Sequence, residues 1–460
     1  MNAIQLRLNG EDRRIDGVAP TTMLLDWLRS EGLTGTKEGC GEGDCGACTV
    51  AVRRHGKPTA ALNACIMPIA LAHGAHVTTV EAVEHPIKHA LVEHHGSQCG
   101  FCTPGFVMTV AALPADTPTD RCSLENALAG NLCRCTGYGP ILAATADAIP
   151  AAPSPSDAPP EVVSLDMSAD GVRFRCPTTE DEFAQALAQS PDARIIAGAT
   201  DVGLWMTKHL YEAAEFISIA SVACLSSIKD DGETLTIGAA VTHADFMAAI
   251  AGKAPSVSEL MRRFAGPQVR AAGTVCGNIA NGSPIGDLPP ALIAAGATVE
   301  IASKTGRRVI PLADFFIAYG RQDRVPGEYV RALRVSWSGL SSVSCHKVSK
   351  RFDSDISAVM AAFSVTLDGD RVSAARIAFG GMAATPKRAP HAEAALIGQP
   401  YTPDGVLGAI AALADDFAPI SDLRASAEYR LKVAGKLFIR DAIERGDKTV
   451  RTRLAGRAAA

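Results

Sequence analysis

The sequence predicts a multidomain α+β protein, and three observations point to that fold class. Its 460 residues correspond to about three domains of ordinary size. The segment 150–161, PAAPSPSDAPPE, contains five prolines and predicts a semi-rigid linker between folded parts. The apolar pattern also changes along the chain: it is mixed strand and helix up to about residue 80, helical over 86–148, and alternating strand and helix over 165–455.

The first predicted domain covers residues 1–83. Residues 3–18 alternate apolar and polar positions around an Asn-Gly pair, which predicts a β-hairpin. Threonines precede an apolar run in 21–32 and a glycine ends it, so we expect a helix capped by threonine. The run CTVAVRR at 48–54 is rich in β-forming residues and predicts another strand.

Three more segments follow from the same patterns. Residues 84–149 are alanine- and leucine-rich with helical periodicity, and they predict a small helical bundle. The linker is placed at 150–165. Beyond it, the alternation of strands and helices stops and restarts near residue 346, so we expect a third domain over 166–343 and a C-terminal α+β subdomain over 344–455.

Composition narrows the classes of function. Hydrophobic residues make up 47% and charged residues 20%, which is ordinary for a soluble globular protein. The net charge of −5, from 44 basic and 49 acidic residues, favours neither nucleic acid nor an anionic membrane surface. The sequence has no apolar run of membrane-spanning length and no signal-peptide pattern at its start, so we expect a cytoplasmic protein.

Cysteines carry the strongest chemical signal in the chain. We call Cys40, Cys45, Cys48 and Cys65 the first cysteine quartet; their gaps of four, two and sixteen residues follow the plant-type C-x4-C-x2-C…C spacing of a [2Fe–2S] cluster. Glycines interleave with the first three cysteines, and they let the backbone approach the sulfur atoms closely. A zinc site would more naturally show two C-x2-C pairs or nearby histidines.

The same loop contains GEGDCG at 41–46, which formally satisfies the G-x-G-x-x-G dinucleotide fingerprint. That fingerprint requires a strand before it and a helix after it. Here cysteines occupy the loop and a strand follows, so we reject the nucleotide interpretation.

A second group of cysteines lies in the predicted helical bundle. We call Cys99, Cys102, Cys133 and Cys135 the second cysteine quartet. Cys133 and Cys135 are close enough to bind one iron, with the other pair on a second iron. Spacing alone leaves zinc or a [4Fe–4S] cluster open. The isolated cysteines are expected to pack as small hydrophobes; they are Cys122, Cys176, Cys224, Cys276 and Cys345.

Two glycine-bearing stretches in the third domain are candidate cofactor loops. Residues 195–208 predict a strand, a turn of small residues and the start of a helix, an arrangement that can cradle a pyrophosphate. Residues 263–291 hold many small residues and one acid, Asp287. Taken alone, each stretch is more often a tight loop than a nucleotide site.

Taken together, the motifs resemble the iron–sulfur and flavin portion of the xanthine dehydrogenase family of molybdenum hydroxylases. The resemblance covers nearly all of residues 1–450, and its motifs occur in the family's order. They are EGCGEGDCGACTV, QCGFCTPGFVM, NLCRCTGYGPI, GPQVRAAGTVCGNIANGSPIGDLPP and KVSKR with SDISAV. One departure is Cys276, where many relatives have glycine.

The resemblance implies a fold for each part and a role for each site residue. It implies a ferredoxin-like β-grasp [2Fe–2S] domain, a four-helix-bundle [2Fe–2S] domain and a vanillyl-alcohol-oxidase-type FAD domain with a C-terminal α+β subdomain. The eight quartet cysteines would then hold two [2Fe–2S] clusters. The implied FAD contacts are the pyrophosphate loop of Ile196, Ala197, Gly198, Ala199, Thr200, Asp201, Val202 and Gly203; Phe264 at the isoalloxazine ring; Thr274 and Asn278 at the diphosphate and ribityl region; Asp287 at the adenosine; Lys347 near the flavin; and Tyr319 beside the nicotinamide site.

The family's activity implies a role in electron transfer with no catalytic residue for substrate hydroxylation in this chain. Electrons would pass from the molybdenum centre of a larger molybdopterin-binding partner to the second quartet, then to the first quartet, FAD and the co-substrate NAD+, during hypoxanthine and xanthine oxidation to urate. Because the sequence stops at residue 460, we expect that partner to be a separate subunit, in a dimer of heterodimers. The alternatives are a related hydroxylase for another heterocycle or an aldehyde, and a ferredoxin-type carrier without NAD chemistry; the choice between NAD+ and oxygen as acceptor stays open.

Overall fold

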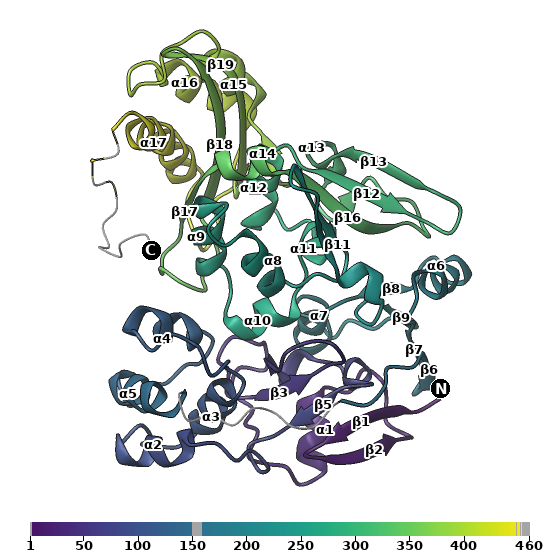
Figure 1. Cartoon of the computed structure of the whole chain (residues 1–460). Helices are drawn as coiled ribbons and strands as arrows, with labels where there is room; N and C mark the ends of the chain where they lie inside the picture. The colour runs from purple at the N-terminus through teal and green to yellow at the C-terminus, as the bar shows by residue number, and fades with distance from the viewer. Residues whose placement is uncertain (1, 150–158, 448, 451, 453–460) are drawn as a thin grey trace.

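The computed structural model describes residues 2–149, 159–447, 449–450 and 452. The predicted linker falls largely on residues 150–158, which lie outside the described residues. In the view of Figure 1 the N-terminal elements form the lower part of the molecule, a central domain follows, and the C-terminal elements lie at the top. The domain boundaries proposed from the sequence stay predictions.

The first domain is a mixed sheet in the order β2-β1-β5-β3-β4. Its strands are β1 (Ile4–Leu8), β2 (Glu11–Ile15), β3 (Thr49–Arg53), β4 (Ala60–Asn63) and β5 (His76–Thr78). The expected hairpin is confirmed, since Leu8 pairs with Glu11 across a two-residue Asn-Gly turn. The expected helix is α1 (Leu24–Ser30), but the prediction of a threonine cap is wrong: Met23 precedes the helix, and no side chain caps it.

The helical domain has four helices, as expected. They are α2 (Ile87–Glu93), α3 (Thr103–Ala111), α4 (Arg121–Ala127) and α5 (Gly139–Ala148). Their apolar faces enclose a small core that includes Leu91, Phe106 and Ile141. Asp120 caps α4, because its side chain accepts from the backbone N–H groups of Cys122 and Ser123.

The central domain contains two larger sheets. Their strands are β6 (Leu165–Ala169), β7 (Val172–Cys176), β8 (Arg194–Ile196), β9 (Glu215–Ser218), β10 (Ile228–Asp230), β11 (Thr234–Gly238), β12 (Thr298–Ala302), β13 (Arg307–Pro311) and β16 (Tyr329–Ser336). The first sheet has the order β6-β7-β9-β8, with parallel pairing among β7, β9 and β8. The second is antiparallel in the order β10-β11-β16-β12-β13.

Helices fill the space around these sheets. They are α6 (Glu180–Gln189), α7 (Val202–His209), α8 (His243–Ile250), α9 (Pro255–Arg263), α10 (Pro267–Ala272), α11 (Val275–Asn281), α12 (Leu288–Ala294), α13 (Leu312–Phe315) and α14 (Trp337–Ser342). A short hairpin of β14 (Phe316–Ala318) and β15 (Arg321–Gln322) projects from the same region. One large hydrophobic core joins the antiparallel sheet to α8, α9, α11 and α12.

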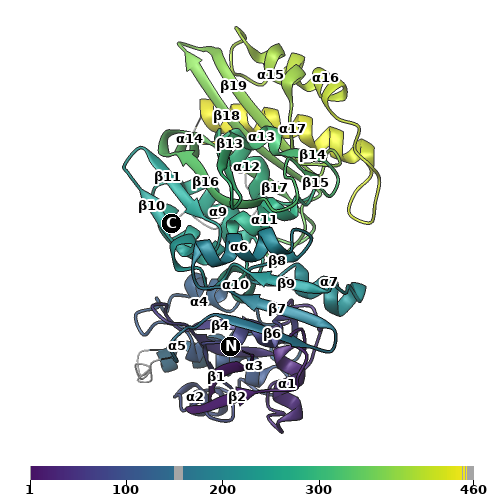
Figure 2. The same ribbon diagram turned by 90° about the vertical axis from the view of Figure 1, so that its right-hand side faces the viewer.

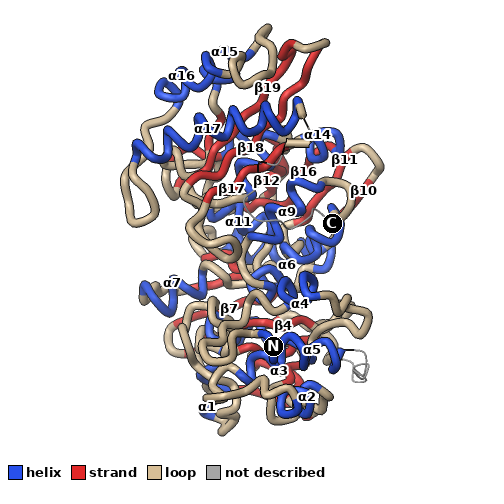
Figure 3. Tube along the Cα trace, turned by 90° about the vertical axis from the view of Figure 1, so that its left-hand side faces the viewer, coloured by secondary structure: helices blue, strands red, loops and turns tan. Residues whose placement is uncertain are grey.

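The C-terminal subdomain is a four-stranded antiparallel sheet with helices against it. Its elements are β17 (Ser344–Val348), β18 (Val359–Asp368), β19 (Arg371–Gly380), β20 (Lys387–Arg388), α15 (Pro390–Leu396), α16 (Leu407–Asp416) and α17 (Ala427–Gly446). Figure 3 shows α17 running along this sheet. Phe363, Phe379 and Phe438 meet in its core through edge-to-face and tilted ring contacts.

The first domain and the central domain share one hydrophobic core. Residues of β6, β7 and β9, including Met167, Phe174 and Phe216, pack in the same cluster as Ile4 and Leu24 of the first domain. Figure 2 shows the sheet β6-β7-β9-β8 between the first domain and the rest of the central domain. The sheet therefore fixes the first cysteine quartet relative to the central domain. None of the described helices is long and apolar enough to span a lipid bilayer.

Candidate functional site: two cysteine quartets and a cofactor cavity

The first cysteine quartet is built by a glycine-rich loop and one short turn. Cys40 and Cys45 lie in the loop between α1 and β3, Cys48 precedes β3, and Cys65 lies in the 3-10 turn after β4. The backbone N–H groups of Glu42, Asp44 and Cys45 each lie 3.4 Å from the Cys40 sulfur. Such N–H groups offset the negative charge that a cluster and its thiolates carry.

Three loop glycines adopt the left-handed conformation, and one makes a close approach possible. Gly41, Gly43 and Gly46 have φ values of 66°, 78° and 68°. At Gly39 a Cβ atom would lie 2.7 Å from the Cys45 sulfur. The glycines therefore allow the loop to wrap around the sulfur atoms, as the sequence predicts.

The four thiols of the first quartet contact one another. Cys40 shares hydrogen bonds with Cys45 and Cys65, and Cys65 also interacts with Cys48. The hydrogen bonds from Cys45 and Cys65 hold the pKa of Cys40 far below the usual thiol value. Cys48 and Cys65 are only 2% and 5% exposed. The structure therefore brings the four predicted ligands together, with Cys48 and Cys65 buried and Cys40 and Cys45 partly buried.

The second cysteine quartet lies at the surface of the helical domain. Cys99 and Cys102 precede α3, whereas Cys133 and Cys135 lie in the loop between α4 and α5. Thiol contacts join Cys99 to Cys135 and Cys102 to Cys133. Each contact therefore links one cysteine before α3 to one cysteine of the loop between α4 and α5. Which pair shares an iron stays a prediction. Cys99 and Cys135 are exposed. Burial, and to a smaller extent the hydrogen bond with Cys133, raises the pKa of Cys102 to about 12.

A backbone hydrogen bond links the two quartets directly. The N–H of Leu132, next to Cys133, donates to the carbonyl of Cys45 at 3.0 Å. Gly105 of α3 packs so closely on the same loop that a Cβ there would lie 2.2 Å from the Gly46 carbonyl oxygen. The helical domain is therefore docked on the loop that holds the first quartet.

Gln268 of α10 ties the central domain to this junction. Its side-chain amide donates to Asn131 at 2.9 Å, to Thr109 at 3.1 Å and to Thr49 at 3.4 Å. Thr49 belongs to the first domain and the other two partners to the helical domain. Because Gln268 is only 1% exposed, these bonds form a buried polar junction of three domains.

The donor sets fit binuclear iron–sulfur clusters. A [2Fe–2S] core takes four thiolates, distributed over its two irons. Each quartet supplies four thiols, so both match that donor number and type.

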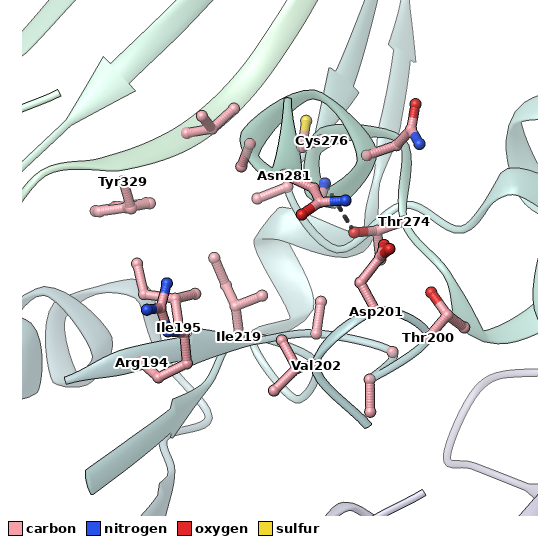
Figure 4. Close-up of a pocket in the computed structure, with 18 of the residues that line it drawn as sticks. Arg194, Ile195, Thr200, Asp201, Val202, Ile219, Thr274, Cys276, Asn281 and Tyr329 are labelled. Carbon is pink, nitrogen blue, oxygen red and sulfur yellow. Dashed lines mark hydrogen bonds between the residues drawn. The ribbon is translucent and has the colours of Figure 1, made fainter. Parts of the chain in front are cut away.

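The central domain encloses the second kind of site, which we call the cofactor cavity. It has a volume of about 700 Å³, within the range of cofactor pockets. Figure 4 shows Thr200 and Asp201 of the loop after β8 and, above them in the view, Thr274, which caps α11, and Asn281 of α11. The lining residues on this loop are Ala197, Gly198, Ala199, Thr200, Asp201 and Val202.

Close backbone packing gives this loop its shape. A Cβ at Gly198 would lie 1.7 Å from the carbonyl oxygen of Ala272, and Ala199 has a φ of 60°. On the opposite side, the Thr274 hydroxyl caps α11 by accepting from the N–H of Gly277 at 3.0 Å. Small residues on both sides leave room for a ligand that contacts the backbone.

Buried polar atoms without partners point into this region. His243 Nδ1 and Asn278 Oδ1 have no hydrogen-bond partner, and both residues line the cavity. Burial, with a smaller effect from Arg270, lowers the pKa of His243 to about 3, so the ring is neutral at physiological pH. A buried polar atom of this kind is costly unless a ligand satisfies it. These atoms, the small-residue loop and the volume fit FAD.

Charged groups also line the cavity. Arg194 stacks over Trp205 and Tyr211, and its guanidinium donates to the Tyr211 hydroxyl. Arg324 lies on the same cavity, and burial lowers its pKa. Burial raises the pKa of Asp201. The guanidinium groups suit a phosphate, whereas Asp201 suits a hydroxyl donor better than a second anion.

The structure brings most of the predicted FAD contacts together. Beyond the loop, the predicted residues that line the cavity are Phe264, Thr274 and Asn278. Ile196 and Gly203, at the two ends of the predicted loop, are not among the lining residues. Ile196 is 1% exposed, and Gly203 packs against Ile66 of the first domain.

The other three predicted FAD or nicotinamide contacts lie outside the lining residues. Asp287 and Lys347 form a buried ion pair, and Ser357 donates to Asp287 at 2.5 Å. Tyr319 lies at the β14–β15 turn and is 74% exposed. Their expected contacts stay predictions.

Several lining residues carry no motif that would have identified them. His243, Arg194 and Arg324 lie outside the motifs, and only their position in the fold brings them to the cavity. Asn281 lies within the motif of 263–291 but is not singled out as a contact. Cys276 also lines it, with its sulfur 3.6 Å from the Ile237 carbonyl. Burial raises the pKa of this thiol to about 12, so it is neutral.

Comparison with known domain families assigns each part of the chain. Residues 6–70 match the 2Fe-2S iron-sulfur cluster binding domain, and 76–146 match the [2Fe-2S] binding domain. Residues 170–337 match the FAD binding domain in molybdopterin dehydrogenase. Residues 344–444 match the CO dehydrogenase flavoprotein C-terminal domain.

Curated relatives and solved structures agree with these domains. The chain is 33% identical over 475 residues to xanthine dehydrogenase of Drosophila pseudoobscura pseudoobscura, covering 85% of this chain and 35% of the relative. It is 31% identical over 501 residues to xanthine dehydrogenase of Emericella nidulans, covering 90% and 36%. Quinoline 2-oxidoreductase from Pseudomonas putida 86 superposes with a TM-score of 0.54 at 27% identity, covering 59% of this chain and 95% of that chain. Carbon monoxide dehydrogenase from Hydrogenophaga pseudoflava gives 0.54 at 29% identity, covering 58% and 94%.

The chain therefore has the domain set of the molybdenum hydroxylase family, with two [2Fe–2S] domains, the FAD-binding domain and the flavoprotein C-terminal domain, and it is an iron–sulfur flavoprotein. Within that family its curated relatives are xanthine dehydrogenases, and the chain spans about a third of their length. The predicted fold class and the predicted [2Fe–2S] and FAD cofactors are confirmed.

Proposed function

We propose that this chain is the electron-transfer subunit of a xanthine dehydrogenase, and that it connects a partner's molybdenum centre to NAD+ during hypoxanthine and xanthine oxidation to urate. The observation that carries the proposal is the continuous contact between its sites. Leu132, beside the second quartet, donates to Cys45 of the first, and α7 runs from the first quartet to the cofactor cavity. The clusters supply single-electron exchange, and the flavin supplies two-electron hydride exchange.

The residues of this chain hold and position those groups. The eight quartet thiolates are the proposed ligands, and the loop N–H groups around Cys40 stabilise their charge. The loop 197–202, Phe264, Thr274 and Asn278 are the proposed FAD contacts. The exposed second quartet is the proposed entry point, since Cys99 and Cys135 lie at the surface where a larger molybdopterin-binding subunit can approach.

The order of the relay can be tested with Cys45→Ala in the chain co-purified with its partner. If the first quartet lies between the flavin and the second quartet, NADH still reduces a small dye at the flavin, but xanthine no longer supports NAD+ reduction. The matched variant Cys122→Ala, outside both quartets, should retain both activities. Folded protein with no bound flavin and no NADH-to-dye activity would contradict the proposal.

A related hydroxylase is the second candidate, because the solved structures that resemble this chain include a quinoline 2-oxidoreductase and a carbon monoxide dehydrogenase. A substrate screen on the co-purified complex separates the candidates. Reduction of the chain's chromophores by a different heterocycle or an aldehyde, and not by xanthine, would favour the second.

A further inference from the structure

Helix α7 is the element that joins the cofactor cavity to the first quartet. Its first residue, Val202, lines the cavity directly after the loop 197–201. Its last turn carries Thr207 and Lys208, which reach the loop of the first quartet. Figures 1 and 3 show α7 at the boundary between the central and first domains.

The contact places a cation against the backbone of a predicted ligand. The ammonium group of Lys208 donates to the carbonyl oxygen of Cys40 at 2.9 Å. The neighbouring Thr207 hydroxyl donates to the carbonyl of Gly41 at 3.3 Å. Lys208 also lies 3.9 Å from the carboxylate of Glu42, a looser contact that opposes part of its charge.

A second contact fixes the position of the helix. Gly203 packs against the residue that follows Cys65, and a Cβ there would lie 2.2 Å from the Ile66 carbonyl oxygen. Both ends of α7 therefore touch backbone next to predicted ligands of the first quartet. This packing holds Lys208 at a defined place although its side chain is 42% exposed.

We propose that Lys208 raises the reduction potential of the first cluster, an inference that rests on the assignment of the first quartet as [2Fe–2S] ligands. One-electron reduction adds one negative charge to the cluster, and a nearby cation stabilises the reduced form more than the oxidised form. Solvent screens a half-exposed ammonium group, so the effect is moderate. Lys208 is a positioning and tuning residue supplied by the flavin-binding part of the chain.

The test is a redox titration of Lys208→Met followed by electron paramagnetic resonance. The first-cluster signal is identified as the one that Cys45→Ala removes. We expect the equilibrium constant for its reduction to fall up to about tenfold, which is about 59 mV for one electron, while the second-cluster signal titrates unchanged. Lys208→Arg should keep the wild-type value, and Glu42→Gln should shift the potential in the opposite direction.

Lys57→Met is the matched control. Lys57 also joins the first domain to the central domain, through an exposed ion pair with Asp245 at 3.1 Å. It lies in the β3–β4 turn, at the end of that hairpin opposite Cys48 and Cys65. It therefore tests loss of an interdomain contact without loss of a charge beside the quartet.

Three outcomes would overturn the inference: an unchanged potential in Lys208→Met, an equal shift in Lys57→Met, or an equal shift in Lys208→Arg. Either of the first two results would show that the charge of Lys208 does not set the potential of the first cluster. The third would assign the shift in potential to side-chain geometry instead of charge. Iron and acid-labile sulfide are measured first in every variant. Their absence from folded wild-type protein would overturn the cluster assignment itself, a failure distinct from an unshifted potential.

Discussion

The first cysteine quartet and the cofactor cavity hold their groups in different ways. The quartet takes all its ligands from a single stretch, from Cys40 to Cys65, and its shape comes from glycines within the same loop. The residues that line the cavity are spread along the chain between Leu187 and Ile356, and they belong to both large sheets and to several helices. The quartet therefore depends on local backbone conformation, whereas the cavity depends on how distant elements pack.

Gly198→Ala is expected to have the largest effect, and to act on the cavity alone. The new Cβ would lie 1.7 Å from the Ala272 carbonyl oxygen and 2.2 Å from its carbon, and backbone atoms cannot rotate away. The loop 197–201 must therefore shift away from its ligand-binding position. We expect bound flavin to fall at least tenfold, measured by absorbance after acid release, with iron content unchanged.

Gly306→Ala is the control for this substitution. Gly306 lies in the turn between β12 and β13, and a Cβ there would meet nothing within 4 Å. Wild-type flavin content is expected in this variant. Normal flavin binding by Gly198→Ala, or parallel loss of flavin and iron, would break the distinction between the two regions.

Gly46→Ala tests the local construction of the quartet. Gly46 has a φ of 68°, and a Cβ there would lie 2.3 Å from the Gly130 carbonyl oxygen. Gly137 has a φ of 69° in open space, so Gly137→Ala has only the conformational cost, about 1–2 kcal/mol. We expect Gly46→Ala to lose about 2 kcal/mol more than Gly137→Ala, as for an overpacked core.

The readouts for this pair are urea unfolding and the iron retained after gel filtration. Flavin content should stay near the wild-type value in both variants, because neither position lines the cavity. Equal destabilisation by the two alanines would show that the packing at Gly130 contributes nothing. Loss of flavin before iron in Gly46→Ala would show that the cavity depends on the quartet loop.

The same difference explains what the sequence could predict. Cys40, Cys45 and Cys48 can be identified as cluster ligands because their spacing and the glycines between them lie within one short stretch of sequence. The contiguous strand and small residues make the loop 197–202 a candidate cofactor loop, but only the family resemblance assigns it to the FAD pyrophosphate. The helical character of residues 84–149 follows from apolar periodicity, and the first hairpin follows from an Asn-Gly turn. The number of helices is implied only by the family resemblance.

Features set by tertiary packing could not be found in this way. His243 is an ordinary helix residue in the sequence, and it becomes a cavity residue only because α8 packs beside Phe264, with ring centroids 4.8 Å apart. The contact between Lys208 and Cys40 joins positions 168 residues apart. The start of α1 is likewise set by a distant segment: Met23 pairs with Pro68, and the N–H of Leu24 donates to the Met67 carbonyl at 2.8 Å.

His243 supplies the smallest predicted effect, a dependence of stability on pH. Its folded-state pKa of about 3 lies below the ordinary value near 6.5 that the unfolded chain has. Above pH ~6.5 the ring is neutral in both states. As pH falls from ~6.5 towards 3, the unfolded chain binds a proton that the folded chain does not, so the free energy of unfolding decreases by about 1.4 kcal/mol at pH ~5.5.

His243→Asn removes this titration while keeping a polar side chain in the cavity. We expect the difference in stability between neutral pH and pH ~5.5 to be smaller by about 1.4 kcal/mol in this variant, measured on FAD-saturated protein by chemical unfolding. His55→Asn, at an exposed position of the first domain, is the control for loss of a histidine outside the cavity. An unchanged profile in His243→Asn would mean that the ring gains a proton in the folded state as readily as in the unfolded state. The cavity would then be as open to solvent as the second quartet, and the contrast between an enclosed flavin site and an exposed cluster would not hold.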